Sequence, residues 1–209
     1  RLIQEDYKQE ITLDSGEKKN IYLIDKNNIH NNSLQVLNQY VNNDGNFDNR
    51  YDVTILVNGL PLVHVELKKR GVDLREAFNQ IERYQRDSFW AGSGLYNFVQ
   101  IFVISNGTLT KYYSNTTREF HINNQKKKKS NSFEFTSYWA DQKNNGITDL
   151  IDFAKTFFTK HTLLNILTKY CVFTSEEDLL VMRPYQIVAT EKILNRIKVA
   201  YNNKFYGTL

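Results

Sequence analysis

The hydrophobic pattern of the chain centres on residues 51–69, where two apolar stretches meet at Asn58-Gly59. Asn-Gly favours the tight turn of a β-hairpin, so the pattern predicts two antiparallel strands here. Three charged residues, Asp52, Glu66 and Lys68, interrupt strands that otherwise suit a buried sheet. Burying charge costs free energy unless the charge has a role. The hairpin is therefore the first candidate for a functional site.

The remaining periodicity predicts a mixed order of strands and helices. The expected strands cover residues 11–13, 21–24, 33–41 (where a short helix would also fit), 98–104, 109–113 and 133–139. The expected helices cover residues 73–88, 147–158, 161–172 and 185–201. The run at 98–104 is the most apolar in the chain and is expected as a central strand. The order predicts an α/β fold, with a central mixed β-sheet flanked by helices and a helical C-terminal segment.

Strand alternation groups the charged side chains of the hairpin by face. Asp52 shares a face with Thr54 on the first strand, and Glu66 and Lys68 share a face with His64 on the second. Two carboxylates and an amine are thus expected on one side of a core hairpin. This combination is typical of a metal-dependent nuclease site.

Hydrolysis of a phosphodiester needs an activated water and stabilisation of charge on the phosphate, and a Mg²⁺ ion held by carboxylates supplies both. Asp52 and Glu66 could provide two oxygen ligands, and the backbone carbonyl of Leu67 a third. Lys68 could position the water or counter developing negative charge. The spacing alone is weak, because an acid two residues before a lysine occurs four times: Asp6/Lys8, Glu17/Lys19, Glu66/Lys68 and Asp141/Lys143.

Composition and charge agree with one globular domain and room for part of a second. The chain has 209 residues and a mass of 24.6 kDa, with 41% hydrophobic and 24% charged residues. A net charge of +4 and a pI near 9.0 lean mildly toward a polyanionic partner. Lys69 and Arg70 form a basic patch beside the candidate site. The lysine run at 126–129 fits a solvated loop better than a DNA contact.

The single cysteine, Cys171, excludes an internal disulfide and a cysteine-based metal cluster and is expected in the core of the fold, on the helix at 161–172. This cysteine usage suits a reducing, cytoplasmic location. The sequence contains no apolar run of membrane-spanning length and no signal-peptide layout at its start. Because Arg1 takes the place of an initiator Met, the chain is expected to be a piece of a longer protein.

The pattern of Asp52 followed by Glu66-Leu67-Lys68 resembles the PD-(D/E)xK nuclease superfamily, with Tyr51 in place of the proline. More specifically, residues 57–68 resemble the restriction (R) subunit of type I restriction-modification enzymes. The resemblance implies a restriction-endonuclease-like core. His64 lies two residues before Glu66 and could assist the site, although a packing role is the more common one for such a histidine.

The same family carries a Gln-x-x-x-Tyr element on the helix that follows the catalytic strand, and Gln80 and Tyr84 match it. Positions four residues apart share a helix face, so these two side chains project together. They could hydrogen-bond a phosphate or steady the hairpin. The resemblance favours this substrate-binding role over a plain surface pair.

The segment Arg183-Pro184-Tyr185-Gln186 is similar to the lead-in of the family's motor domain, where a Gln reads adenine. The phosphate-binding loop that would follow is absent before Leu209, so ATP would serve only the full-length subunit. We therefore expect an endonuclease domain at 1–175, and a linker with the first helix of a superfamily 2 motor domain at 176–209.

The resemblance implies a Mg²⁺-dependent type I site-specific deoxyribonuclease that cuts double-stranded DNA after ATP-driven translocation. Its partners would be the methyltransferase and specificity subunits, with no membrane involved. Two alternatives stay open. One is a nuclease of another PD-(D/E)xK family, of type III or repair function. The other is a non-catalytic DNA-binding or assembly module, whose carboxylates only pair with Lys68.

Overall fold

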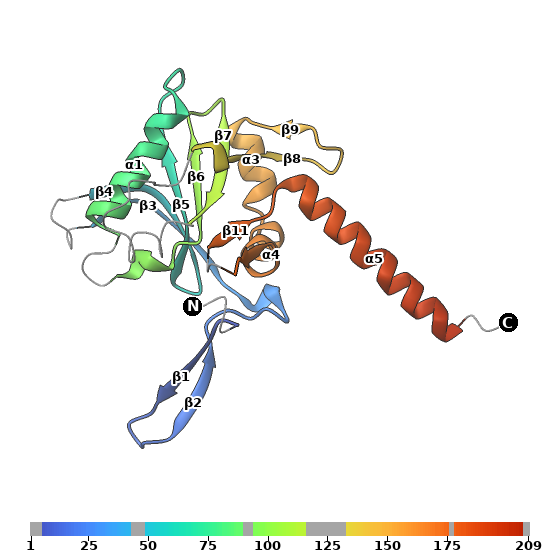
Figure 1. Ribbon diagram of the computed structural model, residues 1–209. Helices are drawn as coiled ribbons and strands as arrows, with labels where there is room; N and C mark the ends of the chain where they lie inside the picture. Colours follow the sequence, from blue (N-terminus) through green and yellow to red (C-terminus); the bar gives the residue numbers. More distant parts are fainter. Residues whose placement is uncertain (1–5, 43–48, 90–93, 116–132, 176–177, 207–209) are drawn as a thin grey trace.

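A computed structural model describes residues 6–42, 49–89, 94–115, 133–175 and 178–206. In this part of the chain, a seven-stranded sheet has the order β3-β4-β5-β6-β7-β8-β9 (Figure 1). β5 and β6 pair in parallel, and the other neighbours pair in antiparallel fashion. The prediction of an α/β fold with a central mixed sheet is confirmed.

The strands of the large sheet are β3 Leu34–Asn42, β4 Asn49–Val57, β5 Leu60–Leu67, β6 Ile101–Ser105, β7 Thr110–Ser114, β8 Ser137–Ala140 and β9 Gly146–Ile147. Two smaller antiparallel hairpins are β1 Lys8–Thr12 with β2 Lys18–Tyr22, and β10 Cys171–Phe173 with β11 Leu179–Val181. The strands expected at 11–13, 21–24, 33–41 and 109–113 are confirmed with shifted ends.

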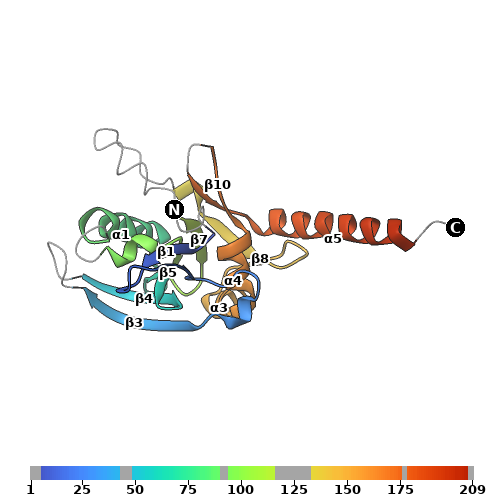
Figure 2. The ribbon, with the colours of Figure 1, turned by 90° about the horizontal axis from the view of Figure 1, so that it is seen from below.

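Within the described ranges the helices are α1 Leu74–Asp87, α3 Leu150–Phe157, α4 Lys160–Lys169 and α5 Pro184–Tyr206. Three of them, α1, α3 and α4, cover the two faces of the sheet (Figures 1 and 2). α1 packs on one face, where its Phe78 and Ile81 form a hydrophobic cluster with Phe102 and Ile104 of β6. α3 and α4 pack on the other face, where Phe153 and Leu164 form a second cluster that includes β5. We call these the α1 face and the α3/α4 face.

The central hairpin forms as predicted. Asn58 and Gly59 both have positive φ, at 50° and 86°, as a two-residue hairpin turn requires. Asn58 also fixes the turn to its neighbours, because its side chain donates to the carbonyl of Leu23 and accepts from the backbone of Ser33. The turn and the apolar pattern together set the register of β4 against β5.

α1 starts at the residue that its sequence indicates. The Asp73 side chain accepts from the backbone N–H of Arg75 and caps the helix. The buried side chains Leu74, Phe78 and Ile81 lie on the face that meets the sheet. Because α1 connects the parallel strands β5 and β6, it lies directly beside the end of β5.

Two predicted strands begin later than expected. A 3-10 turn at Leu95–Phe98 takes up the first residue of the run 98–104, and β6 starts only at Ile101. The run 133–139 also opens with a 3-10 turn, Phe133–Phe135. There the Thr136 hydroxyl donates to the Phe133 carbonyl at 2.7 Å, which holds the turn and delays β8 to Ser137. Apolar composition alone did not reveal these turns.

The two helices after the sheet are shorter than predicted. α3 starts at Leu150 because Asp149 caps it and Gly146–Ile147 pairs as β9. α4 ends at Lys169, and Cys171 lies in β10 rather than on the helix, which corrects the prediction. The expectation that Cys171 is a core residue is confirmed, since it is 5% exposed.

α5 extends away from the sheet (Figure 2). It covers the predicted helix at 185–201 and continues to Tyr206. The division into domains at 1–175 and 176–209 stays a prediction, and the lysine run at 126–129 lies outside the described residues. None of the described helices is long and apolar enough to cross a membrane.

Candidate active site on the central hairpin

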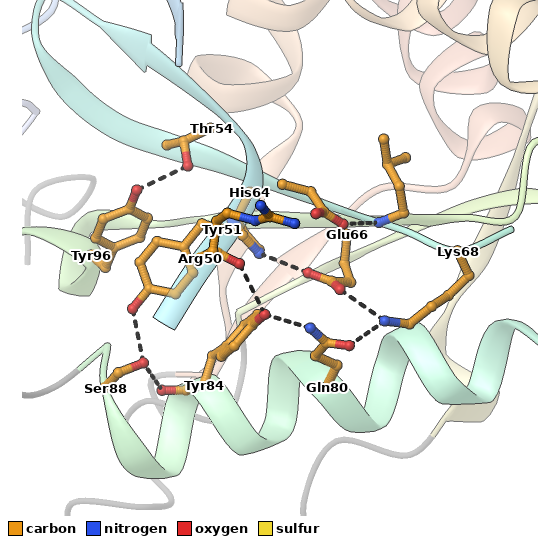
Figure 3. A network of polar contacts seen from close by, with 12 residues as sticks. Arg50, Tyr51, Thr54, His64, Glu66, Lys68, Gln80, Tyr84, Ser88 and Tyr96 are labelled. Atoms are coloured by element: carbon orange, nitrogen blue, oxygen red, sulfur yellow. Dashed lines mark hydrogen bonds and ion pairs between the residues drawn. The ribbon is translucent and has the colours of Figure 1, made fainter. Parts of the chain in front are cut away.

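β4 and β5 bring the predicted acidic residues together on the α1 face, and Figure 3 shows Glu66 between the hairpin and the helix that carries Gln80 and Tyr84. The pairing of Val53 with Val65 and of Thr54 with His64 places Asp52 opposite Glu66. Asp52 Oδ2 accepts from the backbone N–H of Leu67 at 2.8 Å, so its side chain reaches across to β5. The grouping that strand alternation predicted is therefore present.

Lys68 follows the last residue of β5 and turns back toward Glu66. Its Nζ donates to Glu66 Oε1 at 3.0 Å and also to Gln80 Oε1 on α1. Glu66 is 1% exposed, whereas the side chain of Lys68 keeps 21% of its surface in contact with solvent. The amine therefore lies at the entrance of a site in which the carboxylate is buried.

Gln80 and Tyr84 form the helical side of the site. Gln80 Nε2 donates to the Tyr84 hydroxyl, and that hydroxyl donates to the Arg50 carbonyl at 3.2 Å. A continuous chain of polar contacts thus runs from Glu66 through Lys68 and α1 back to β4 (Figure 3). Gln80 and Tyr84 thus project together, as expected, and Gln80 contacts Lys68 directly.

Burial governs the ionisation of Asp52. Loss of solvent raises the pKa of the Asp52 carboxyl, the Leu67 N–H opposes this shift, and the negative charge of Glu66 adds to it. Burial likewise raises the pKa of Tyr84. Tyr84 is thus a neutral hydrogen-bonding group near neutral pH, and Asp52 would gain from a cation that offsets its buried charge.

One oxygen of Glu66 has a particular environment. Oε2 is buried and has no hydrogen-bond partner among the described residues, and His64 Nε2 lies 3.7 Å from it. A buried carboxylate oxygen without a donor is a costly arrangement that a cation would relieve. The oxygen donors of Asp52 and Glu66 also fit the preference of Mg²⁺ for hard ligands.

The described residues contain no group of three or more His, Cys, Asp or Glu side chains able to hold a metal. Mg²⁺ commonly uses one or two carboxylates and completes its shell with water and substrate phosphate. The pair Asp52 and Glu66, with the Leu67 carbonyl, therefore suits Mg²⁺ better than a metal that needs a closed protein cage.

His64 lies in a box of aromatic rings. It is 0% exposed, and the ring centroids of Tyr51, Tyr84 and Phe89 lie 5.3–6.0 Å from that of His64. Neither ring nitrogen has a hydrogen-bond partner among the described residues. Packing therefore fixes His64, whose Nε2 lies 3.7 Å from Glu66 Oε2.

Several supporting residues were not predicted from the sequence. The Tyr51 hydroxyl donates to Ser88 Oγ at 2.8 Å, and Ser88 donates to the Tyr84 carbonyl at the end of α1. Thr54 Oγ1 lies 3.0 Å from the Tyr96 hydroxyl. Alternation had placed Thr54 beside Asp52, but its partner is 42 residues away and gave no local signal.

The other predicted residues lie further out. Lys69 and Arg70 are exposed beyond the end of β5. Gln186 lies on α5, where its Oε1 accepts from the backbone N–H of Arg183 at 2.8 Å and caps the helix. The structure does not bring Gln186 into contact with the hairpin site.

The mixed sheet, with its β5–α1–β6 crossover and the acidic hairpin beside it, defines a restriction-endonuclease-like fold. A family model described as type I restriction enzyme R protein N terminus matches residues 1–121. The chain belongs to this family, and the match includes every residue of the hairpin site.

Three similar proteins carry related descriptions. The type I restriction enzyme EcoprrI endonuclease subunit of Escherichia coli is 53% identical over 98% of this chain. The SauCOLORF180P endonuclease subunit of Staphylococcus aureus is 38% identical over 95% of it. The putative MjaIXP endonuclease subunit of Methanocaldococcus jannaschii is 36% identical over 50% of it. The chain spans 62%, 20% and 10% of the lengths of these relatives, respectively.

Proposed function

We propose that this chain is the Mg²⁺-dependent endonuclease domain of a type I restriction R subunit, with PD-(D/E)xK chemistry on double-stranded DNA. The observation that carries the proposal is the contact of Lys68 with both Glu66 and Gln80, beside Asp52. Membership of the R-protein family supports it. The relatives named as endonuclease subunits agree with a nuclease.

The metal would be held by Asp52, Glu66 and the carbonyl of Leu67. When bound, Mg²⁺ would neutralise charge on the scissile phosphate and lower the pKa of a water molecule. Glu66 Oε2, which has no partner among the described residues, is available as a ligand. Asp52 keeps one oxygen on the Leu67 N–H and can turn the other toward the metal.

Lys68 would act on the reacting phosphate. Its amine has three donors, and two of them are directed to Glu66 and Gln80. The third can meet a phosphate oxygen and offset its growing negative charge. Gln80 holds the amine in place, and Tyr84 holds Gln80 against the Arg50 carbonyl. Lys69 and Arg70 would bind neighbouring phosphates.

The whole subunit would do more than this chain. We expect it to move DNA with ATP and to cut after translocation, together with methyltransferase and specificity subunits. Gln186 would read adenine in that longer protein, on a motor domain that starts within 176–209. The hairpin would then cut DNA that the other parts select and deliver.

Cleavage by the assembled full-length enzyme tests the proposal. Asp52→Asn, Glu66→Gln and Lys68→Ala are each expected to lower the cleavage rate by about 100-fold or more, while ATP-driven translocation continues. Chelation of divalent ions should stop cleavage in the parent enzyme. DNA cleavage and translocation are measured on the same preparation.

The matched control is the acid-x-lysine pair Asp141 and Lys143. It has the same spacing but lies in an exposed turn, where Asp141 accepts from the backbone of Lys143 and Asn145. Asp141→Asn and Lys143→Ala should leave cleavage at the parent rate. Full cleavage by all three hairpin variants would instead favour a non-catalytic DNA-binding or assembly module.

A further inference from the structure

A second group of cations lies on the α1 face, away from the hairpin site. Arg75 on α1 and Lys111 on β7 both pack against the ring of Phe133: the Arg75 guanidinium carbon is 4.7 Å and the Lys111 Nζ 4.6 Å from its centroid. Lys111 Nζ is also 4.6 Å from the centre of Tyr138. The aromatic rings therefore hold two positive groups near one another in fixed positions.

These charges are not neutralised within the described part of the protein. No described carboxylate forms an ion pair with Arg75 or Lys111, although the exposed pairs Lys18–Glu10 and Arg86–Asp87 show that such pairs form elsewhere. Burial lowers the pKa of the Lys111 amine, and the positive charge of Arg75 lowers it further. Two neighbouring cations that repel each other, one of them the half-buried Lys111, are a costly arrangement that an anion would relieve.

Within the described part of the chain, Arg75 and Lys111 also have unused hydrogen-bond donors that an anion could accept. Lys111 Nζ donates to Thr136 Oγ1 at 3.1 Å, which leaves two of its three N–H groups without an oxygen acceptor among the described residues. The exposed guanidinium of Arg75 makes no side-chain hydrogen bond within the described ranges. The pair thus offers several donors and two charges to one anionic group, as phosphate recognition requires.

The strand register relates this pair to the candidate active site. Glu66 pairs with Ile104, and Ile104 pairs with Lys111, so the side chains of Glu66 and Lys111 belong to one row on the α1 face. Two strand spacings separate them, roughly 10 Å. Arg75 precedes Gln80 by five residues on α1, which is roughly 7.5 Å along the helix axis.

We propose that Arg75 and Lys111, held by Phe133 and Tyr138, form a second phosphate-binding subsite that takes a backbone phosphate of the DNA strand beside the one at Lys68. This inference rests on the proposed nuclease function and extends it, because it gives the path of the strand across the α1 face. The strand runs from the end of β5, over the first turns of α1, toward β7 and β8.

The salt dependence of DNA binding tests this subsite. The full-length subunit binds a fluorescently labelled DNA duplex in the presence of chelator, so that no cleavage occurs, and anisotropy gives the affinity over a series of salt concentrations. Log affinity falls as log salt rises, and each lost phosphate contact makes this slope shallower by about 0.9. Because the two cations bind one phosphate, Arg75→Gln with Lys111→Met is expected to make the slope shallower by about 0.9.

A matched double variant removes the same charges elsewhere. Arg86→Gln is on α1, where Asp87 already pairs with the arginine, and Lys155→Met is on α3, across the sheet. This control should leave the slope at the parent value. If the Lys111 variant does not fold, the single variant Arg75→Gln decides, because Arg75 is exposed and its loss should make the slope shallower by up to about 0.9.

An unchanged slope in the folded Arg75/Lys111 variant would overturn the subsite. If the slope is unchanged and subunit assembly is weakened as well, the pair lies at a protein interface and the subsite is likewise overturned. Cleavage by Asp52→Asn separates this outcome from failure of the nuclease proposal. Loss of cleavage there, with a parental slope in the Arg75/Lys111 variant, would retain the nuclease and remove only the subsite.

Discussion

The two faces of the central sheet are built from the same strands but have opposite chemistry. On the α3/α4 face, Val63 and Val65 of β5 pack with apolar side chains of α4 such as Leu164. On the α1 face, the alternate residues His64 and Glu66 are buried, His64 among aromatic rings and Glu66 in an ion pair with Lys68. Both faces carry a hydrophobic core, but the α1 face of β5 also buries polar groups, and such buried polar groups are typical of a functional site.

The largest difference between the two faces is expected at Val65 and Glu66, which are neighbours on β5 but point to opposite faces. Glu66→Gln should lower DNA cleavage by about 100- to 1,000-fold with little loss of stability, because it removes a buried charge and keeps the shape. Val65→Ala, one residue earlier on the other face, should cost about 1–3 kcal/mol of stability and leave the chemistry intact. Single-turnover cleavage and urea unfolding of both variants check this.

The same two variants can contradict the division between the faces. Parental cleavage by Glu66→Gln, or a cleavage defect in a fully folded Val65→Ala protein, would show that the chemistry does not follow the alternation along β5.

The α3/α4 face should be sensitive to lost volume. Leu164 is 0% exposed, and Leu164→Ala should destabilise the protein by about 2–5 kcal/mol through lost burial and a cavity. Ile151→Ala on α3 is the control, because Ile151 is 57% exposed and its loss should change stability by less than about 0.5 kcal/mol. Urea unfolding measures both, and equal costs would contradict the packing described for this face.

A smaller effect is expected at Gln80, which supports the site from α1. Gln80→Leu should lower cleavage about tenfold, because Lys68 and Tyr84 lose their common partner. The measurement is cleavage rate against Mg²⁺ concentration. Asn79→Leu is the control: it makes a similar change at an exposed neighbouring position of α1 and should keep the parental rate.

The smallest effect concerns pH and the α3/α4 face. Burial raises the pKa of Cys171 from 9.0 to about 12. Below pH 9 the thiol is protonated in both the folded and the unfolded chain, so its full contribution to stability is present. Between about pH 9 and 12 the unfolded chain ionises first, and this contribution is lost as pH rises.

Urea midpoints over this pH range should therefore fall more steeply for the parent protein than for Cys171→Ala. The comparison of slopes removes the shared titration of tyrosines, several of which also have raised pKa values, such as Tyr7 and Tyr112. Parallel slopes would show that Cys171 ionises equally easily in both states.

Local signals predicted the elements around the site well. The positive φ angles of Asn58 and Gly59, and the cap of α1 at Asp73, follow from side-chain and backbone preferences that act within a few residues. The 3-10 turns before β6 and β8 and the early end of α4 were missed. They depend on hydrogen bonds and strand pairing that apolar content does not encode.

The sequence by itself determined which residues of the hairpin share a face, because side-chain alternation is a local property of any strand. It thereby placed Glu66 with Lys68 and left Val65 for the opposite core. Only the tertiary structure decided what meets them. The parallel pairing of β5 with β6 lays α1 across the strand end, brings Gln80 to Lys68, and aligns Lys111 with Glu66. Contacts between segments far apart in the chain depend on packing of the whole sheet, which no local pattern specifies.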